Sequence, residues 1–290
     1  MQAIAAYITP TLLFPLAAAT VALLFFSHWW SELMCRPTAL ERVRQWVISP
    51  RMSFAAARHP MERRDALPLL LLTAVYAFSA FWGLGARAAP QSFQSFADVS
   101  EVTVSLDREV TLTGVTYYTG LGTGEYTLEA SADGQTWQAL PRIRQTYTTL
   151  FKWQTLEGED KTPLTPMRAR YLRLTALKDS LELGELALYG TADGGTQPAL
   201  LDLSPGGIGV AGADALFDEQ EVIPAERSYL TSSYFDEIYH ARTAYEHIRG
   251  VYPYEVSHPP LGKLLIGLGI RAFGMTPFGW RFVGTLFGVL

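Results

Sequence analysis

YTLEASADGQTW, residues 126–137, is the stretch that decides the fold of the middle of this 290-residue chain. Tyr126–Ala130 alternates apolar and polar side chains, which predicts a strand. Ala132–Gln135 (ADGQ) predicts a tight turn before Trp137. Similar short runs, rich in Val, Thr and Tyr, occur at Val102–Leu106, Val110–Tyr118 and Tyr171–Thr175. Residues 91–190 are therefore expected to form an all-β sandwich domain.

Two further blocks follow in order, RARYLRLTA at residues 168–176 and LGELALYG at residues 183–190. Together with residues 126–137 they resemble the discoidin, or coagulation factor 5/8 type C, family. The resemblance implies an eight-stranded jelly-roll of the galactose-binding-like class. Members of that family often bind glycans or lipid head groups, so a glycan partner is one expectation. A packing or spacer domain is the other.

The regions on either side of this domain are strongly apolar. No charge occurs between Met1 and Ser27, and residues 1–30 contain a run, Ala3–Phe26, that exceeds the roughly 20 residues needed to cross a bilayer. His28–Trp30 would then be an interfacial anchor. A cleaved signal peptide is the alternative, but no basic region precedes the run. A second uncharged run, Leu67–Ala86, predicts another membrane span over residues 67–89.

Residues 31–66, between the two predicted spans, have more arginines than acidic residues. Because positively charged loops stay in the cytoplasm, the β-domain and everything after it are expected outside the plasma membrane. The single cysteine, Cys35, excludes a disulfide scaffold and would lie in the reducing compartment. The formal charge of −5, with 49% hydrophobic and only 18% charged residues, argues against nucleic acid as a partner.

Residues 191–228 are rich in Gly, Pro and Asp and are expected to form a linker. They contain the pattern G-x-G-x-x-G at residues 207–212. A dinucleotide-binding fingerprint needs a strand before the glycines and a helix after them. Neither is predicted here, so flexible glycines explain the pattern better.

Residues 229–279 are expected to form an external loop that carries an acidic pair and an interfacial helix. A helix should run from Tyr234 to about Arg249, with Thr231, Ser232 and Ser233 as possible caps. SHPPLGK, residues 257–263, then introduces an apolar helix over 264–273 that lies at the interface. Residues 280–290 read as the start of a span too short to cross a membrane, which predicts that the chain is the N-terminal part of a longer polytopic protein.

Three features in this order resemble the protein O-mannosyltransferase family of GT-C glycosyltransferases, in particular its bacterial, phospholipid-carrier-dependent members. They are Tyr-Phe-Asp-Glu at 234–237, His-Pro-Pro-Leu-Gly-Lys at 258–263 and Phe-Gly-Trp-Arg at 278–281. The expected fold class is an α-helical polytopic membrane protein with an inserted β-sandwich. The resemblance implies transfer of a hexose, mannose above all, from a polyprenyl-phosphate carrier to a protein Ser or Thr hydroxyl with inversion. An extra first span and the inserted β-domain depart from the family's pattern.

The resemblance also assigns roles to residues, and the residue types suit them. Asp236 is the candidate base, because an inverting displacement needs one on the face opposite the leaving group. Glu237 would orient Asp236 or the acceptor. His258, Lys263 and Arg281 are candidates for binding the anionic lipid phosphate. The structural alternatives are helix-start acids for the pair and interfacial anchors for the cations.

No cofactor is expected beyond the lipid-phosphate sugar, although a divalent metal is not excluded. Asp236, His240 and His247 share one helical face and are the metal ligands that the sequence offers. Membrane lipids and an acceptor protein are the other expected partners. A different class of function is also open, namely a membrane-anchored glycan-binding module that acts through the jelly-roll. The acidic pair and the Pro-Pro-Leu-Gly-Lys segment favour the enzyme, because an anchor needs neither.

Overall fold

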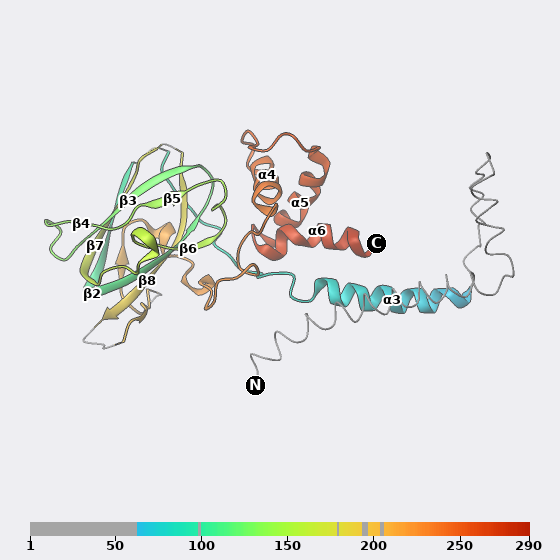
Figure 1. Ribbon diagram of the computed structural model, residues 1–290, viewed down its shortest axis with the longest axis horizontal. Coiled ribbons are helices and arrows are strands. Elements are labelled where there is room, and N and C mark those ends of the chain that lie inside the picture. Colours follow the sequence, from blue (N-terminus) through green and yellow to red (C-terminus); the bar gives the residue numbers. More distant parts are fainter. Residues whose placement is uncertain (1–62, 98–99, 179, 193–196, 204–205) are drawn as a thin grey trace. The chain divides into compact units, whose positions relative to one another are not determined.

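The computed structural model describes residues 63–97, 100–178, 180–192, 197–203 and 206–290 (Figure 1). The predicted first span and nearly all of the predicted basic loop lie outside these residues. The chain divides into two units, residues 1–79 and residues 80–290. Each is described by itself below.

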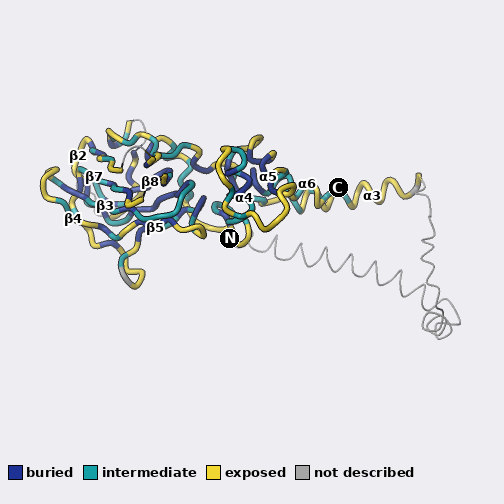
Figure 2. Tube along the Cα trace, turned by 90° about the horizontal axis from the view of Figure 1, so that it is seen from above, coloured by how far each residue is buried: buried dark blue, intermediate teal, exposed yellow. Residues whose placement is uncertain are grey.

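In the first unit the described residues form most of helix α3 (Arg63–Phe81). Most of its apolar side chains are exposed, and the helix is largely yellow in Figure 2. The helix ends earlier than the predicted span of residues 67–89, and two glycines with positive φ, Gly83 and Gly85, follow it. Among the residues that the structure describes, no helix has both the length and the apolar character needed to cross a bilayer.

The second unit contains an antiparallel β-domain followed by three helices. The strands are β1 (Gln94–Ser95), β2 (Glu101–Thr119), β3 (Gly124–Ser131), β4 (Gln138–Ala139), β5 (Ile143–Gln145), β6 (Trp153–Thr155), β7 (Met167–Ala176), β8 (Glu182–Ala192), β9 (Ala199–Leu200) and β10 (Val210–Ala211). The helices are α4 (Glu237–Arg249), α5 (Pro260–Phe273) and α6 (Pro277–Val289). The predicted all-β domain is therefore confirmed.

One long strand, β2, builds both layers of the sandwich. Its first half pairs with β7, β7 pairs with β3, and β3 pairs with β4. Its second half pairs with β8 and β6. The register between β2 and β7 shifts between Ser105 and Val110, as at a β-bulge. Because the extra residues bend the strand there, the two predicted runs at 102–106 and 110–118 form one continuous element that folds the sheet over itself.

The alternating side chains of these strands fill the space between the layers. Inward positions of β2, β3, β7 and β8 form one apolar core whose members include Leu106, Leu112, Tyr126, Leu128, Leu172, Leu174 and Leu188. The dark blue parts of the strands in Figure 2 trace this core. Burial of such side chains contributes about 1.5–3 kcal/mol each, so the alternation in the sequence is what stabilises the domain.

The predicted tight turn at 132–135 is present and is fixed by a carboxylate. Asp133 accepts hydrogen bonds at Oδ1 from the backbone N–H groups of Thr136 (2.7 Å) and Gln135 (2.8 Å). These backbone N–H groups, with the hydroxyl of Ser131, lower the pKa of Asp133 to about 2. Gly134 has φ +74°, a conformation that glycine adopts without a steric cost.

Part of residues 191–228, which were predicted to form a linker, pairs and packs with the β-domain. β9 pairs with β8, and β10 pairs with β2. The apolar residues between them, Leu201, Leu203, Ile208, Leu216 and Phe217, are buried in the sandwich core. The composition suggested a linker because Gly, Pro and Asp separate these apolar residues, which therefore form no regular pattern in the sequence. The residues after Gly207-x-Gly209 form β10 rather than a helix, so the dinucleotide fingerprint is absent here.

The three C-terminal helices begin and end close to where the sequence predicts. Gly250 ends α4 with φ +69°, Pro260 begins α5, and the Thr276 hydroxyl caps α6 by accepting from Gly279 N. A second apolar cluster joins these helices to one end of the β-domain. It contains Tyr118, Phe151 and Trp153 from the β-domain and Ala241, Ala244, Ile270 and Trp280 from the helices.

Glu185 of β8 is a buried acid within the β-domain. It accepts hydrogen bonds from Gln220 and from Glu219 N (3.1 Å), but burial raises its pKa from 4.5 to about 7. The folded state therefore binds the proton more tightly than the unfolded state. This contribution to the free energy of unfolding is complete below about pH 4.5 and is lost as the pH rises to about 7, by at most about 1.4 kcal/mol per pH unit.

Glu185→Gln should remove this part of the pH dependence. The measurement is the urea unfolding midpoint of wild type and variant at several values between pH 4.5 and 7.5. The amide keeps an acceptor for Gln220, and the other titrating groups are common to both proteins. Glu226→Gln, at an exposed acid, is the matched control. If Glu185→Gln and wild type lose stability in parallel, burial of Glu185 is not the cause.

Candidate functional site

A hollow of about 510 Å³ lies at the start of α4, and α5 and α6 form its other walls. Both members of the predicted acidic pair, Asp236 and Glu237, line it together with Arg281 of α6. His240, one turn further along α4, also lines it, as do the apolar residues Leu84, Ile266 and Trp280. The structure thus brings together three of the five predicted site residues.

Asp236 lines this hollow, and its carboxylate has no hydrogen-bond or ion-pair partner among the residues that the structure describes. The residue is exposed and stands at the N-cap position of α4, yet its side chain makes no capping hydrogen bond. The preceding residue, Phe235, has φ +46° and is 74% exposed. A bulky side chain in this left-handed region is strained, and such strain is typical of functional sites. The pair does stand at the helix start, as the structural alternative has it, but the Asp236 side chain caps no backbone N–H group there.

Glu237 is held by Arg281 in a two-pronged ion pair. Arg281 donates from Nε to Oε1 (2.6 Å) and from Nη2 to Oε2 (2.7 Å). Arg281 also donates to the carbonyl oxygens of Leu84 (2.9 Å) and Tyr229 (2.8 Å). Such paired charge-assisted bonds fix both side chains in position. Arg281, predicted to bind phosphate, is thus engaged by Glu237 and by backbone in this structure.

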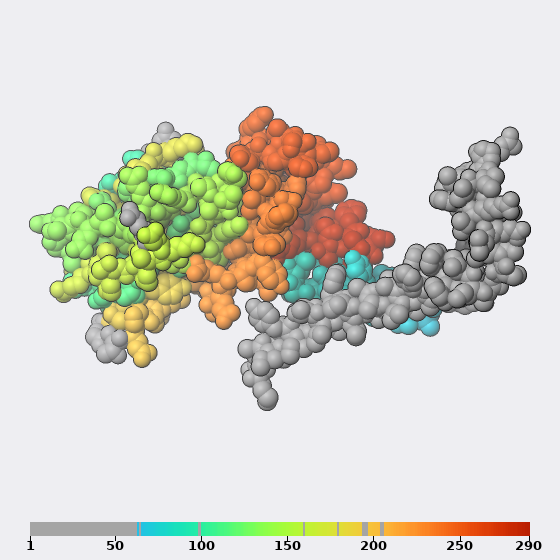
Figure 3. All heavy atoms as spheres, in the orientation of Figure 1, coloured from blue at the N-terminus to red at the C-terminus, as the bar shows by residue number. Residues whose placement is uncertain are grey.

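The segment before Asp236 is attached to the β-domain, while Tyr234 N donates to Glu237 Oε2 (2.9 Å) in the first turn of α4. Ser233 donates from Oγ to Leu150 O (3.1 Å) and from its N–H to Phe151 O (3.3 Å). Ser232 accepts at Oγ from Trp153 N (3.4 Å). In Figure 3 the orange atoms of this part of the chain lie against the yellow-green atoms of the β-domain. The predicted caps Ser232 and Ser233 instead position the acidic pair relative to the β-domain.

Lys152, in the same β-domain loop, is a cation that sequence reasoning missed. It is partly buried, and this burial lowers its pKa, while the negative charge of Glu237 partly opposes the shift. The charge of Glu237 therefore acts on Lys152. No local motif marks this lysine, because its relation to Glu237 arises only when the β-domain packs on the helices.

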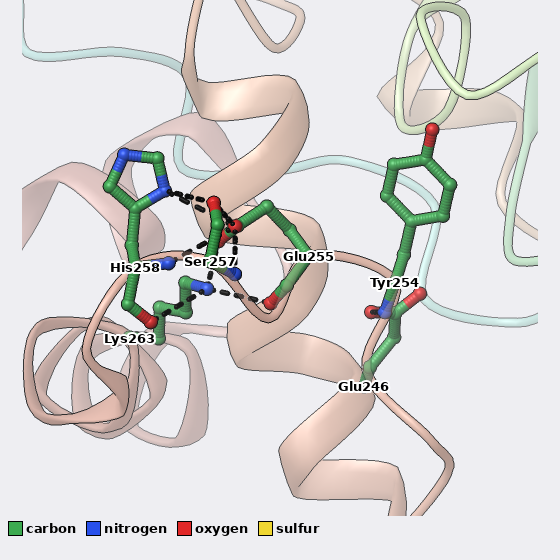
Figure 4. Close-up of polar contacts among 6 residues, drawn as sticks. All are labelled: Glu246, Tyr254, Glu255, Ser257, His258 and Lys263. Atoms are coloured by element: carbon green, nitrogen blue, oxygen red, sulfur yellow. Dashed lines mark hydrogen bonds and ion pairs between the residues drawn. The ribbon is translucent and has the colours of Figure 1, made fainter.

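The other two predicted residues, His258 and Lys263, meet at a residue that the sequence analysis missed, Glu255 (Figure 4). Lys263 is only 3% exposed; its Nζ donates to the Glu255 carboxylate and to the Glu255 carbonyl oxygen (2.7 Å). Glu255 Oε1 also accepts from Ser257 N (2.6 Å). The Lys263 ammonium, then Ser257, hold the pKa of Glu255 well below its usual range. The one signal in the sequence that could have indicated Glu255 is its position three residues before His258.

His240 lies between the two groups of residues. Its ring packs edge-on against the ring of His258, with centroids 5.1 Å apart and an interplanar angle of 82°. His240, Glu255 and His258 each offer a ligand atom within 4.8 Å of the others. Asp236 and His247, which the sequence grouped with His240, belong to no such cluster in the described part of the chain. Three carboxylates, Glu185, Asp218 and Glu219, form the second cluster.

No family model matches the chain. Over 35 residues it is 57% identical to the polyprenol-phosphate-mannose–protein mannosyltransferase of Mycobacterium tuberculosis, in strains CDC 1551 / Oshkosh and H37Rv alike. The match covers 12% of this chain and 7% of the mycobacterial enzyme. The similarity to a mannosyltransferase is therefore local.

Several solved structures are similar to about a third of the chain. The C-terminal domain of a Bacteroides fragilis chitobiase is 19% identical over 31% of this chain and 62% of its own, with a TM-score of 0.26. The family 32 carbohydrate-binding module of Streptococcus pneumoniae EndoD is 13% identical over 37% of this chain and 81% of its own, with a TM-score of 0.29. A Clostridium perfringens CBM32 module in complex with GalNAc-β-1,3-galactose is 20% identical over 30% of this chain and 63% of its own, with a TM-score of 0.25.

Proposed function

We propose that this chain forms part of a membrane glycosyltransferase. In the proposed reaction a hexose, mannose, passes from a polyprenyl-phosphate carrier to a Ser or Thr hydroxyl of an acceptor protein. The local similarity to a mycobacterial mannosyltransferase supports the reaction class. The observation that carries the proposal is the free Asp236 carboxylate in a hollow, beside a Glu237 that Arg281 holds in place.

The two acids differ in the way an inverting transfer requires. Asp236 has no partner among the described residues, so it can accept the proton of the attacking hydroxyl. The hydroxyl oxygen then bonds to the anomeric carbon while the bond from that carbon to the phosphate oxygen breaks. Glu237 remains paired with Arg281, and we assign it the positioning role that the sequence suggested.

The phosphate that leaves gains negative charge, which a nearby cation would stabilise. Lys263 and Arg281 were the predicted cations, but Glu255 and Glu237 already engage them. Lys152 is a further candidate, because the charge of Glu237 acts on it and the structure gives it no hydrogen-bond or ion-pair partner among the described residues. The inserted β-domain would then supply one group of the site.

Apolar side chains around the hollow suit a lipid carrier. On α5, Leu261, Leu264 and Leu268 are exposed at 67%, 51% and 56%, a stripe with helical spacing. Tyr234 and Phe235, at the hollow itself, are 63% and 74% exposed. Exposed apolar stripes and aromatic groups of this kind are typical of surfaces that contact lipid. They support a site at a membrane surface, and we propose the outer face of the plasma membrane on the charge pattern of the sequence.

The test is transfer by the complete protein in membrane vesicles. With polyprenyl-phosphate [³H]mannose as donor, label should enter a Ser/Thr peptide and be released by β-elimination. The same peptide with Ala at the acceptor positions is the control. Label arriving from a nucleotide-linked mannose instead, or none from the lipid donor, would overturn the proposal.

A glycan-binding β-domain is the second candidate. A hollow of about 330 Å³ on this domain is lined by Tyr189, Thr116, Thr155 and Arg227, an aromatic and polar set that suits a sugar. Retention of the chain on immobilised glycans, lost in Tyr189→Ala, would support binding. Glycan retention and mannosyl transfer are measured independently, so a positive result for one does not exclude the other.

A further inference from the structure

We propose that His240, Glu255 and His258 form a binding site for one divalent transition-metal ion, best suited to Zn²⁺. The three residues come from α4 and from the loop that precedes α5, and the fold brings their ligand atoms within 4.8 Å of one another. Two imidazoles and one carboxylate are a set that binds Zn²⁺ and leaves a fourth position open.

The distance between His258 and Glu255 fits a shared ion. His258 Nδ1 lies 3.2 Å from Glu255 Oε1. Two ligand atoms at about 2.0–2.1 Å from a tetrahedral Zn²⁺ stand about 3.3 Å apart. One ion would therefore bind both atoms without a large movement of either side chain.

The arrangement of the two imidazoles fits as well. A ring that binds through one nitrogen places its centroid about 3.2 Å from the metal, so two such rings at a tetrahedral angle have centroids about 5.2 Å apart. The rings of His240 and His258 have centroids 5.1 Å apart and are nearly perpendicular. The two rings therefore lie at the separation that a shared ion requires, and the Glu255 carboxylate stands within reach of both.

The surroundings hold the carboxylate ready to bind. Ser257 N and His258 N (3.2 Å) donate to Glu255 Oε1, and Lys263 donates to Oε2. Figure 4 shows dashed contacts from both the His258 ring and Lys263 to the Glu255 carboxylate. Hydrogen bonds of this kind orient metal-binding carboxylates. The positive charge of Lys263 opposes the ion, whereas the free carboxylate of Asp236, one turn before His240, favours it.

The site adjoins the hollow, because His240 lines it together with Asp236. An ion with an open position there could bind an anionic oxygen. If the transferase proposed above is correct, a phosphate oxygen of the donor is the natural occupant. Metal binding itself is measured without any donor, so its failure and that of the proposed reaction are distinguishable.

The experiment titrates the purified chain with Zn²⁺ by isothermal calorimetry and measures bound zinc after dialysis. We expect one ion per chain. His240→Ala and His258→Ala should each weaken this binding about 100-fold or more, because losing a ligand costs at least as much as losing a residue that orients one. His258 is 63% exposed in its side chain, so this variant should fold.

His247→Ala is the matched control, since His247 stands on the same helix outside the cluster. It should bind zinc as wild type does. Equal affinity in wild type, His240→Ala and His258→Ala would overturn the proposal and place the zinc at other histidines. Absence of stoichiometric binding to the wild-type chain would overturn it too.

Discussion

Asp236→Asn should lower the turnover of mannosyl transfer about 10²- to 10⁴-fold, the usual contribution of a positioned general base. The amide cannot take the proton of the acceptor hydroxyl, but it occupies nearly the same volume. Asn is as good an N-cap residue as Asp, so α4 should remain intact. The KM for the lipid donor should change little, because the base acts on the acceptor. The measurement is steady-state transfer by the complete protein.

Glu226→Gln serves as the control for this variant, because it removes the charge of another exposed acid shortly before the site. It should transfer mannose at the wild-type rate. Glu237→Gln should differ from both, since it weakens the pair with Arg281 and so raises KM as well as lowering kcat. If Asp236→Asn turns over as fast as Glu226→Gln, Asp236 is not the base.

Arg242→Met should destabilise the second unit by about 3–5 kcal/mol, because it leaves a buried carboxylate without its partner. Arg242 and Glu246 lie one turn apart on α4, with side chains 8% and 4% exposed, and Arg242 Nε is 2.7 Å from Glu246 Oε1. Arg242 also lies over the ring of Tyr254, 4.2 Å from its centroid. The measurement is the free energy of unfolding from urea titration.

The double variant Arg242→Met, Glu246→Gln tests the cause of this loss. The neutral amide still accepts from Tyr254 N, which donates to Glu246 Oε2 at 2.7 Å in the wild type. Since no buried charge is left unpaired, most of the stability should return. A double variant as unstable as Arg242→Met alone would mean that lost packing around Tyr254, and not the stranded charge, is responsible.

The β-domain was predictable because each of its main strands carries its own signal. Alternation in residues 126–130 and 171–175 is a local property, and so is the turn chemistry of Asp133 and Gly134. The role of residues 197–224 was not predictable in this way. Leu203 and Ile208 are buried in a core formed by strands that are distant in sequence. No periodic pattern of apolar residues around them predicts these contacts.

The site was predictable only in part, and for a similar reason. Asp236 and Glu237 were singled out by a motif, but the motif does not say that Arg281 pairs with Glu237 across 44 positions. His258 and Lys263 were expected to be available for phosphate, whereas Glu255 engages both. Charge pairing is decided by distances in space, and a sequence shows only charges in order.

The cluster that joins Tyr118, Phe151 and Trp153 to Ala241, Ala244 and Trp280 has a consequence for protein engineering. The β-domain is inserted in the sequence but is not a detachable module. Excising it would remove the apolar side chains that pack against α4, and it would break the hydrogen bonds from Ser233 to the carbonyl oxygens of residues 150 and 151. A shortened chain would therefore need a redesigned apolar surface on its helices, and a simple truncation should yield an insoluble product.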